Sequence, residues 1–554
     1  MKTGKFILSL ILCLTLAGGL VSLTSAGTAT PALDSGYEFA LPLTEEKQSF
    51  TVAVTAHAQV SKFDASENLF TKWFEDQTNV HFDFEVFPAE QQAAAVNTYL
   101  AAGRYADIMM FQSVGEFPTA TMYSYAKNGS FIPLTEMIDT YGVWTQNLFE
   151  RKPLMRDALT QVDGEIYTLP CLNDVQHQWS IDKAFVYTPF LEAVGITELP
   201  DTLDEFKEML IAFRDGDPNK NGINDEIPAA TYYTNDYVSF GAGVEAYLMD
   251  AFIVTSKMPE LKYTTVRNNE IIAGFMTDEW RDGLRWIKTL YDEKLIAPES
   301  FTQDATQFLA MGENPDAPIL SVALCGQPPR FITCYGESGR WLDYECLPAL
   351  IGPSGKQETL YNPYFGFRLN AGVISSTCKD PVLAFKALDY MLNEEASMNH
   401  FYGIGGWSVD DIPEDGIAVN GGKATWRQTY EFGVETTYNW LGVSVLGLTM
   451  EMRTSELASA ELPLEPWLFN ETAEKYLKYR QPDSDVMPFL HYEESEAEEV
   501  LDIATTVNRY VAQMVVAFVT GTANIETEWD GYLNTLKSMD VDRCLEIMNK
   551  DFAR

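Results

Sequence analysis

The most specific cluster of chemistry-bearing residues is an oxygen-rich loop, Asp-Gly-Asp-Pro-Asn-Lys-Asn-Gly-Ile-Asn-Asp-Glu-Ile-Pro, which begins at Asp215. Side-chain oxygens recur at every second position from Asp217, a glycine follows at position six, and position seven can offer its backbone carbonyl: Asp217, Asn219, Asn221, Gly222 and Ile223. This spacing is the start of an EF-hand loop. The glutamate expected at position twelve is replaced by Pro228, and the acids come earlier in the loop.

Hard oxygen ligands with several negative charges suit calcium better than a transition metal. The loop follows a helix and has no reactive group beside it, so a bound ion would be structural. The alternative is a run of Asx turns without an ion.

No catalytic signature accompanies this loop. The five histidines are scattered, and the sequence has no Gly-x-Ser-x-Gly elbow, His-Glu-x-x-His pair or phosphate-binding glycine loop. A glycoside hydrolase or lyase needs two carboxylates facing each other across a sugar, and 80 Asp and Glu residues allow many such pairs. An exported carbohydrate-active hydrolase or lyase therefore remains an open alternative.

The charge balance excludes one class of partner. The 554 residues include 38 Lys and Arg against 80 Asp and Glu, a formal net charge of −42. Such a field repels phosphate backbones, so we expect no nucleic-acid binding. With 46% hydrophobic residues and only 21% charged, the chain is globular, and its length requires at least two lobes.

The N-terminal segment has the form of a secretory signal peptide. Lys2 and Lys5 precede an apolar run from Phe6 to Val21, and small residues follow up to Ala26. We expect residues 1–26 to be removed; the loss of two lysines and no acids takes the charge from −42 to −44. A lipobox would place Cys after Leu-Ala-Gly, but Gly19 stands there, which makes a lipid anchor doubtful.

Six cysteines remain after the signal peptide, in a compartment where disulfides are permitted. The cluster Cys325, Cys334 and Cys346 allows one bridge. Buried free thiols are an equal alternative in so large a chain.

Hydrophobic periodicity predicts alternating strands and helices. Residues 27–47 are expected to be a tether, and strand patterns begin near Phe50, with a helical pattern at residues 69–74 and a second strand at 81–87. A helix at residues 93–102 and a buried strand at 106–111 follow. Thr202 and Glu205 form a capping box, and the C-terminal region is helical, with one apolar face ending at Gly521.

Several ordered stretches together carry a family resemblance. They are Asn97-Thr-Tyr-Leu-Ala-Ala-Gly-Arg-Tyr-Ala-Asp-Ile, Gly129-Ser-Phe-Ile-Pro-Leu-Thr-Glu-Met-Ile, Asp163-Gly-Glu-Ile-Tyr-Thr-Leu-Pro, Leu199-Pro-Asp-Thr-Leu-Asp-Glu-Phe, and Phe518-Val-Thr-Gly ahead of Trp529-Asp-Gly-Tyr. In order and spacing the chain resembles the extracellular solute-binding proteins of sugar-type ABC importers, in the subgroup of lipoproteins and alginate-oligosaccharide binders. It departs from the usual Pro-Asp at Ala106-Asp107 and from Arg-Lys-Asp at Ile181-Asp-Lys-Ala.

The resemblance implies an α/β fold of the periplasmic-binding-protein type II, with two lobes joined by hinge strands and a helical C-terminal region. We expect an N-terminal lobe of residues 48–170 and 366–430. Residues 171–365 and 431–554 would form the C-terminal lobe. The shorter calcium loop of the alginate-binding relatives maps to Asp217, Asn219, Asn221, the Ile223 carbonyl, Asp225 and Glu226.

The resemblance also implies a ligand in the cleft between the lobes. Sugars are held by aromatic faces and by paired hydrogen bonds to hydroxyls. Residues of these types at strand ends and crossings are the candidate ligand-binding residues: His57, Asp107, Gln112, Asn173, Asp174, Trp179, Arg330, Tyr364, Trp407 and Trp440.

The expected function is capture of an oligosaccharide outside the cytoplasm, at the cell surface, and its delivery to the transmembrane subunits of an ABC permease. We expect a monomer that is not an enzyme, and a neutral or weakly charged ligand because of the negative charge. A peptide-binding or sensory receptor on the same fold is a further alternative.

Overall fold

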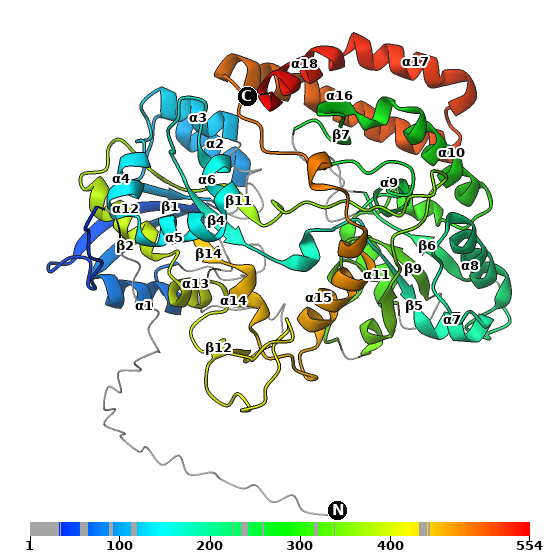
Figure 1. Cartoon of the computed structure of the whole chain (residues 1–554), viewed down its shortest axis with the longest axis horizontal. Helices are drawn as coiled ribbons and strands as arrows, with labels where there is room; N and C mark the ends of the chain where they lie inside the picture. The colour runs from blue at the N-terminus through cyan, green and yellow to red at the C-terminus, as the bar shows by residue number, and fades with distance from the viewer. Residues whose placement is uncertain are drawn as a thin grey trace, which may run out of the picture.

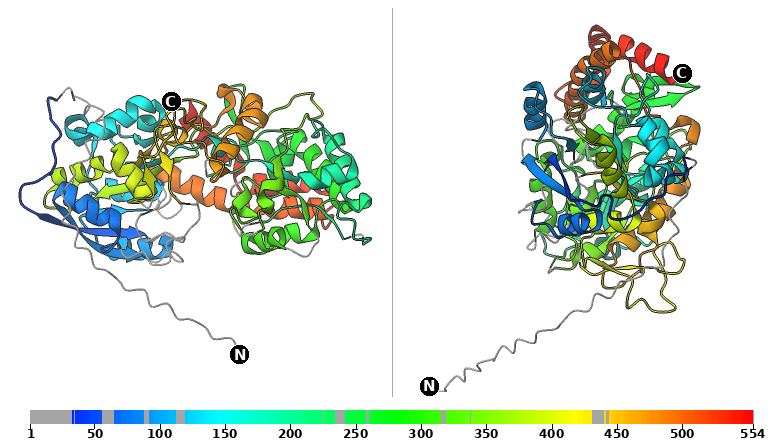
Figure 2. Two further views of the ribbon diagram at one scale, coloured as in Figure 1. Left: turned by 90° about the horizontal axis from the view of Figure 1, so that it is seen from below. Right: turned by 90° about the vertical axis from the view of Figure 1, so that its left-hand side faces the viewer.

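The computed structural model describes residues 33, 35–55, 65–87, 92–111, 119–223, 225–233, 242–257, 260–314, 319–336, 338–430, 440 and 444–553. These residues form two lobes that lie side by side, each built around its own β-sheet and hydrophobic core (Figures 1 and 2). The predicted fold class, two α/β lobes with a helical C-terminal region, is confirmed.

The sheet of the first lobe has six strands in the order β14-β4-β11-β3-β1-β2. Their bounds are β1 Gln48–Thr55, β2 Val80–Phe87, β3 Ile108–Met110, β4 Leu169–Asn173, β11 Phe367–Ile374 and β14 Leu446–Leu448. β11 runs antiparallel to both of its neighbours, whereas the other pairs are parallel. The carboxyl ends of five strands therefore meet at one edge of this sheet.

Alternating side chains of these strands enter different cores. Val52 and Val54 join a cluster covered by α1 Leu69–Thr78, α4 Thr135–Tyr141, α5 Val143–Arg151, α6 Pro153–Leu159, α12 Pro381–Tyr390 and α13 Glu394–Phe401. Ala53 and Met109 face the other side, where α2 Gln92–Ala101 and α3 Thr119–Lys127 pack. This period-two alternation is what a sheet covered on both faces requires.

The sheet of the second lobe has four strands in the order β10-β5-β9-β6. Their bounds are β5 Ala184–Tyr187, β6 Ile227–Ala230, β9 Leu320–Leu324 and β10 Tyr344–Cys346, and β5 is antiparallel to its neighbours. The helices of this lobe are α7 Thr188–Val194, α8 Leu203–Gly216, α9 Glu245–Met249, α10 Asp278–Asp292, α11 Ala305–Glu313 and α15 Leu464–Lys475. The predicted capping box of Thr202 and Glu205 opens α8.

The C-terminal helices complete the second lobe. α16 Glu494–Thr520 packs on α10 and on α18 Val541–Phe552, with α17 Ile525–Ser538 between them in sequence (Figure 1). Trp280 and Trp529 are buried in the same core. α16 ends at Gly521, which has φ +79°, as the sequence predicted, and it also contacts α3 of the first lobe.

The predicted lobe boundary after residue 430 is wrong. β14 pairs with β4 inside the first sheet, and Trp440 and Val445 lie in the core of the first lobe. The chain therefore returns to the second lobe only between α14 Met450–Thr454 and α15.

The predicted tether also needs correction. Residues 35–47 run along the first lobe: Phe39 stacks on Tyr390 with ring centroids 5.4 Å apart, and Lys386 Nζ lies 4.6 Å from the ring centroids of both Tyr37 and Tyr141. We call residues 35–47 the strap.

All six cysteines outside the signal segment are free, so the bridge considered for Cys325, Cys334 and Cys346 is not formed. Within the described part of the chain, no helix is both long and apolar enough to cross a membrane.

Candidate functional site

Among the described residues, three segments pass between the lobes. The first crossing, residues 174–183, follows β4; the second crossing, residues 359–366, precedes β11; the third crossing, residues 455–463, joins α14 to α15. β4 ends and β5 starts at the first crossing, so the carboxyl-end edges of the two sheets face each other there. In open α/β sheets, ligands bind outside this edge.

The crossings are tied to one another on the side of the second lobe. The Asn362 amide donates to the Trp179 carbonyl at 2.7 Å, and the Gln481 amide donates to the Thr359 carbonyl at 3.1 Å. Thr359 Oγ1 also donates to Asp250 Oδ2 at 3.0 Å. Two crossings therefore enter the second lobe as one anchored unit.

A buried ion pair supports this anchor. Lys257 Nζ lies 2.5 Å from Asp182 Oδ2, with 8% and 0% of the two side chains exposed. Burial, with Asp182 nearby, holds the pKa of Asp250 well above its usual value. The Lys257–Asp182 pair has a structural role, because removing one partner would leave the other as an uncompensated buried charge.

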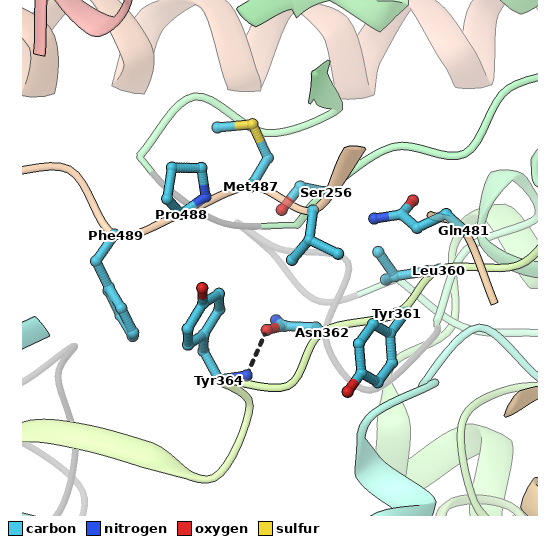
Figure 3. A pocket seen from close by; sticks show the side chains of 10 residues that line it. Ser256, Leu360, Tyr361, Asn362, Tyr364, Gln481, Met487, Pro488 and Phe489 are labelled. Carbon is cyan, nitrogen blue, oxygen red and sulfur yellow. Dashed lines mark hydrogen bonds between the residues drawn. The ribbon is translucent and has the colours of Figure 1, made fainter. Parts of the chain in front are cut away.

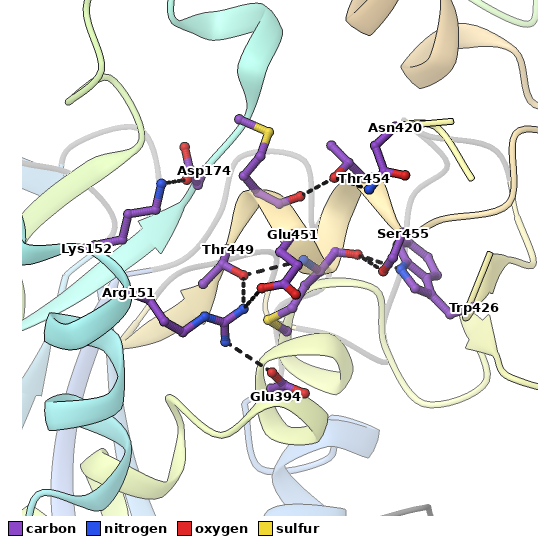
Figure 4. Close-up of polar contacts among 12 residues, drawn as sticks. Arg151, Lys152, Asp174, Glu394, Asn420, Trp426, Thr449, Glu451, Thr454 and Ser455 are labelled. Atoms are coloured by element: carbon purple, nitrogen blue, oxygen red, sulfur yellow. Dashed lines mark hydrogen bonds and ion pairs between the residues drawn. The ribbon is translucent and has the colours of Figure 1, made fainter. Parts of the chain in front are cut away.

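The structure brings three predicted ligand residues together at the first crossing. Asp174 is buried and forms an ion pair with Lys152 (Figure 4). It also accepts a hydrogen bond from Trp179 Nε1 at 3.0 Å, and Lys152 Nζ lies 5.8 Å from the Trp179 ring centroid. Asn173 Oδ1 accepts from Arg453 Nη1 at 3.1 Å. The Asp174 carboxylate and the Asn173 side-chain oxygen are thus engaged by the protein itself.

Tyr364 lies on the second crossing and lines a pocket (Figure 3). Its ring meets Phe489 edge-to-face, with centroids 4.8 Å apart. The pocket is lined by the second crossing, by the segment before α16 and by Ser256, which follows α9: Ser256, Leu360, Tyr361, Asn362, Tyr364, Gln481, Val486, Met487, Pro488 and Phe489.

Two other candidates keep places compatible with a ligand role. Arg330 ends a short 3-10 turn that follows β9 at the carboxyl edge of the second sheet, and it is partly exposed. Trp407 is partly exposed in β12 Trp407–Ser408, and its Nε1 donates to Asn399 Oδ1 at 2.8 Å.

Two candidates are contradicted. Asp107 precedes β3, at the amino-terminal edge of the first sheet, and its Oδ2 accepts from both the amide and the hydroxyl of Thr51 at 2.8 Å. Trp440 is 0% exposed, and its Nε1 donates to Thr71 Oγ1 at 3.0 Å, so it is a core residue. His57 and Gln112 lie outside the described residues.

The sequence analysis did not identify several residues that lie around Trp179 at the first and second crossings. Tyr361 contacts Trp179 edge-to-face at 6.0 Å, and the Arg480 guanidinium lies 4.4 Å from the Tyr361 ring centroid. The aromatic pair is half-buried at the crossings, between Lys152 and Arg480. No local pattern marks these residues, because they come from four segments of the chain.

The predicted calcium loop is a tight turn held by its own side-chain hydrogen bonds. Asp217, Lys220 and Gly222 have positive φ values of 47°, 58° and 76°. The carboxylate of Asp217 accepts from the amides of Asn221 and Gly222 at 3.0 Å, and Asn219 Oδ1 accepts from the Asn221 amide at 2.9 Å. Over the described residues, no three His, Cys, Asp or Glu side chains form a metal-binding group by themselves.

The environment of Glu226 indicates whether this loop is suited to a cation. Both of its carboxylate oxygens are inaccessible and have no hydrogen-bond partner among the described residues. Burial raises the pKa of Glu226, and the charges of Asp225 and Asp217 raise it further. The side-chain amides of Asn219 and Asn221 donate to Asp225 Oδ1 at 3.1 Å. A cluster of oxygens with an orphaned buried carboxylate fits calcium.

No family model matches this sequence. A fructooligosaccharide ABC transporter substrate-binding protein, FusA of Streptococcus pneumoniae, is 25% identical over 559 aligned positions, which cover 97% of this chain and 96% of FusA. Lipoprotein LipO of Bacillus subtilis is 31% identical over 309 residues, covering 55% of this chain and 57% of LipO.

Solved structures share the fold. FusA of S. pneumoniae in complex with kestose superposes with a TM-score of 0.71 at 22% identity, covering 91% of this chain and 99% of FusA. An HMO-binding, ABC-transporter-associated solute-binding protein of Bifidobacterium longum infantis gives a TM-score of 0.74 at 18% identity, covering 91% of this chain and 98% of that protein. The chain is therefore a homologue of FusA, an ABC transporter substrate-binding protein, and it shares the fold of these solute-binding proteins.

Proposed function

We propose that the protein is the substrate-binding component of an ABC transporter and captures an oligosaccharide between its lobes. The observation that carries the proposal is the alignment with FusA along nearly the whole of both chains. The facing carboxyl-end edges of the two sheets supply the place for the ligand. Closure of the lobes by a hinge motion would then enclose the sugar.

The ligand class we propose is a neutral oligosaccharide, with fructooligosaccharides as the first candidates. FusA is described as a fructooligosaccharide binder and has been solved with kestose. The formal charge of −42 disfavours polyanions, although the effect is screened beyond about 10 Å at ordinary salt. Of the predicted ligand residues we retain Trp179, Arg330, Tyr364 and Trp407, together with His57 and Gln112, for this role.

The partners follow from the same homology. We propose a monomer outside the cytoplasm that delivers the sugar to the transmembrane subunits of an ABC permease. Binding without chemical change separates this function from the hydrolase or lyase alternative.

Calorimetric titration with kestose, nystose and trigalacturonate tests the proposal. We expect heat and lobe compaction in small-angle scattering with a neutral fructan, and no new reducing ends after prolonged incubation. Release of reducing sugar would establish a hydrolase. Binding of trigalacturonate alone would overturn the proposed ligand class.

We also propose that the loop of Asp217, Asn219, Asn221, Ile223, Asp225 and Glu226 holds a structural calcium ion. The buried, unpartnered carboxylate of Glu226 supports it. A FusA variant solved with fructo-nystose is described as an EF-hand mutant, which indicates such a loop in that relative. The ion would stabilise the start of the second lobe, where the loop connects α8 to β6.

A further inference from the structure

A single guanidinium group links the two lobes beside the crossings. Arg453 belongs to α14 of the first lobe, and its Nη1 donates to Asn173 Oδ1, at the end of β4 in that lobe, at 3.1 Å. Its Nη2 lies 3.1 Å from Glu465 Oε1. Glu465 stands in the first turn of α15, whose Leu464 and Leu468 are buried in the core of the second lobe.

Arg453 and Glu465 flank the third crossing, where the chain passes from the first lobe to the second. The third crossing remains paired with the first lobe through residue 458, since the Leu457 amide donates to the Trp426 carbonyl at 2.8 Å and the Ala458 amide to the Ile417 carbonyl at 2.9 Å. Leu464 is already held in the second lobe, because its amide donates to Tyr335 Oη at 3.1 Å. Only residues 459–463 remain between the two attachments.

The pair is shielded from water. The Arg453 side chain is 9% exposed and that of Glu465 is 25% exposed. Two neighbouring ionisable groups carry little charge near pH 7: burial lowers the pKa of His177 to about 4, and burial with the Glu465 charge raises that of Glu456 to about 8. Arg453 and Glu465 therefore pair directly in a largely buried setting, where their attraction is weakly screened.

The planar shape of the Arg453 guanidinium contributes to the link between the lobes as much as its charge does. A guanidinium is planar and holds its donors in a rigid fork, so the two bonds of Arg453 fix the angle between Asn173 and Glu465 as well as their separation. A lysine would keep the charge but present rotatable donors from one atom. The first crossing is also tied to α15 nearby, where Gln176 Nε2 donates to the Phe469 carbonyl at 3.2 Å.

We propose that Arg453 is the pivot of the hinge: it holds Asn173 of one lobe and Glu465 of the other at a fixed angle and thereby sets the resting separation of the lobes. It is a positioning residue that acts through Asn173 and Glu465. Its effect on sugar affinity rests on the proposed function, whereas its effect on lobe geometry does not. When the pivot is lost, the lobes sample a wider range of separations, and the fraction that is ready to bind falls.

Distance measurements between the lobes test the pivot in the ligand-free protein. Spin labels carried by noncanonical amino acids replace exposed Asp76 in α1 and exposed Glu208 in α8. We expect Arg453→Lys and Glu465→Gln to broaden the distance distribution relative to the unsubstituted protein. If the binding-ready fraction falls tenfold, the apparent dissociation constant for a bound fructan rises about tenfold.

Arg151→Lys is the matched control. Arg151 is also ion-paired, but its partners Glu394, Thr449 and Glu451 all lie in the first lobe (Figure 4). We expect this variant to lower the melting temperature and to leave the width of the distance distribution unchanged.

An unchanged distribution in folded Arg453→Lys and Glu465→Gln overturns the pivot. If a single variant does not fold, the double variant Arg453→Met with Glu465→Met removes both charges without stranding one, and it should also broaden the distribution. If the unsubstituted protein binds no sugar, the proposed function fails while the distance measurement still decides on the pivot.

Discussion

The backbone carbonyl of Asn173 lies 2.3 Å from the position that a Cβ atom on Gly366 would occupy. The Asn173 amide also donates to the Gly366 carbonyl at 3.0 Å. The two residues stand where the first and second crossings meet the first sheet. Because real Cβ contacts are never so short, only glycine allows the two crossings to run this close together.

Gly366→Ala should therefore destabilise the protein by about 1–3 kcal/mol, the usual cost of forcing extra volume into a packed site. It should also weaken sugar binding, since the crossings must separate. Gly531→Ala is the control, because no atom lies within 4 Å of its Cβ position in α17 and alanine favours a helix by about 0.5–1 kcal/mol. Equal melting temperatures for the two variants would contradict this account.

The strap should stabilise the first lobe. Phe39→Ala removes the ring that stacks on Tyr390 and meets Trp144 at 5.8 Å, at an expected cost of about 1–3 kcal/mol. The loosened strap should be cut faster by a glutamate-specific protease at exposed Glu38. Tyr141→Phe keeps the ring face that Lys386 contacts, so it should leave the cleavage rate unchanged. Equal cleavage of Phe39→Ala and the unsubstituted protein would show that the strap is only loosely attached.

His400 should make the first lobe sensitive to acid. Its ring stacks on Phe70 at 5.1 Å, and burial lowers its pKa to about 3. The unfolded chain binds a proton near pH 6.5 and the folded chain does not, so stability is present above that pH and falls by about 1.4 kcal/mol per unit below it.

His400→Phe keeps the ring stack and removes the titrating group. Between pH 7.5 and 5 the unsubstituted protein should lose about 2 kcal/mol more unfolding free energy than this variant. Urea unfolding followed by tryptophan fluorescence measures the difference. Parallel pH profiles would mean that His400 does not carry the acid sensitivity.

Local patterns were sufficient for the lobes but not for their junctions. The alternation in β1 and β2, the capping box at Thr202 and the glycine stop at Gly521 are short-range signals, and the structure confirms them. β14 has only three residues, and its partner β4 lies more than 270 residues earlier in the chain, so no local pattern reveals the pairing. The boundary at residue 430 failed for this reason.

The candidate site shows the same limit. The aromatic side chain of Trp440 is equally compatible with a sugar-binding cleft and with a core, and its packing against Phe70 places it in the core. Arg453 carries no signal in its own segment, because its partners lie on β4 and α15. Residue types at strand ends identify a region, whereas long-range packing decides which side chains remain available there.

The calcium proposal gives the last prediction. A chelator should lower the melting temperature, since an ion held only by the folded chain at a hundredfold above its dissociation constant contributes about 2.7 kcal/mol. Glu226→Gln should have a higher melting temperature than the unsubstituted protein in chelator, because it removes a buried, unpartnered carboxylate. In the presence of calcium, Glu226→Gln should have a lower melting temperature than the unsubstituted protein, because the variant lacks one charged calcium ligand.

This crossing of the two melting temperatures separates an ion site from a simple turn. Asp204→Asn, an exposed change in the first turn of α8, is the control and should shift both conditions equally. Sugar affinity should be unaffected at a temperature where both forms are folded, because the loop lies between α8 and β6, before the carboxyl edge of the second sheet. If chelator leaves the unsubstituted protein unchanged and elemental analysis finds no calcium, the loop from Asp217 to Glu226 is a turn held by its own Asx hydrogen bonds.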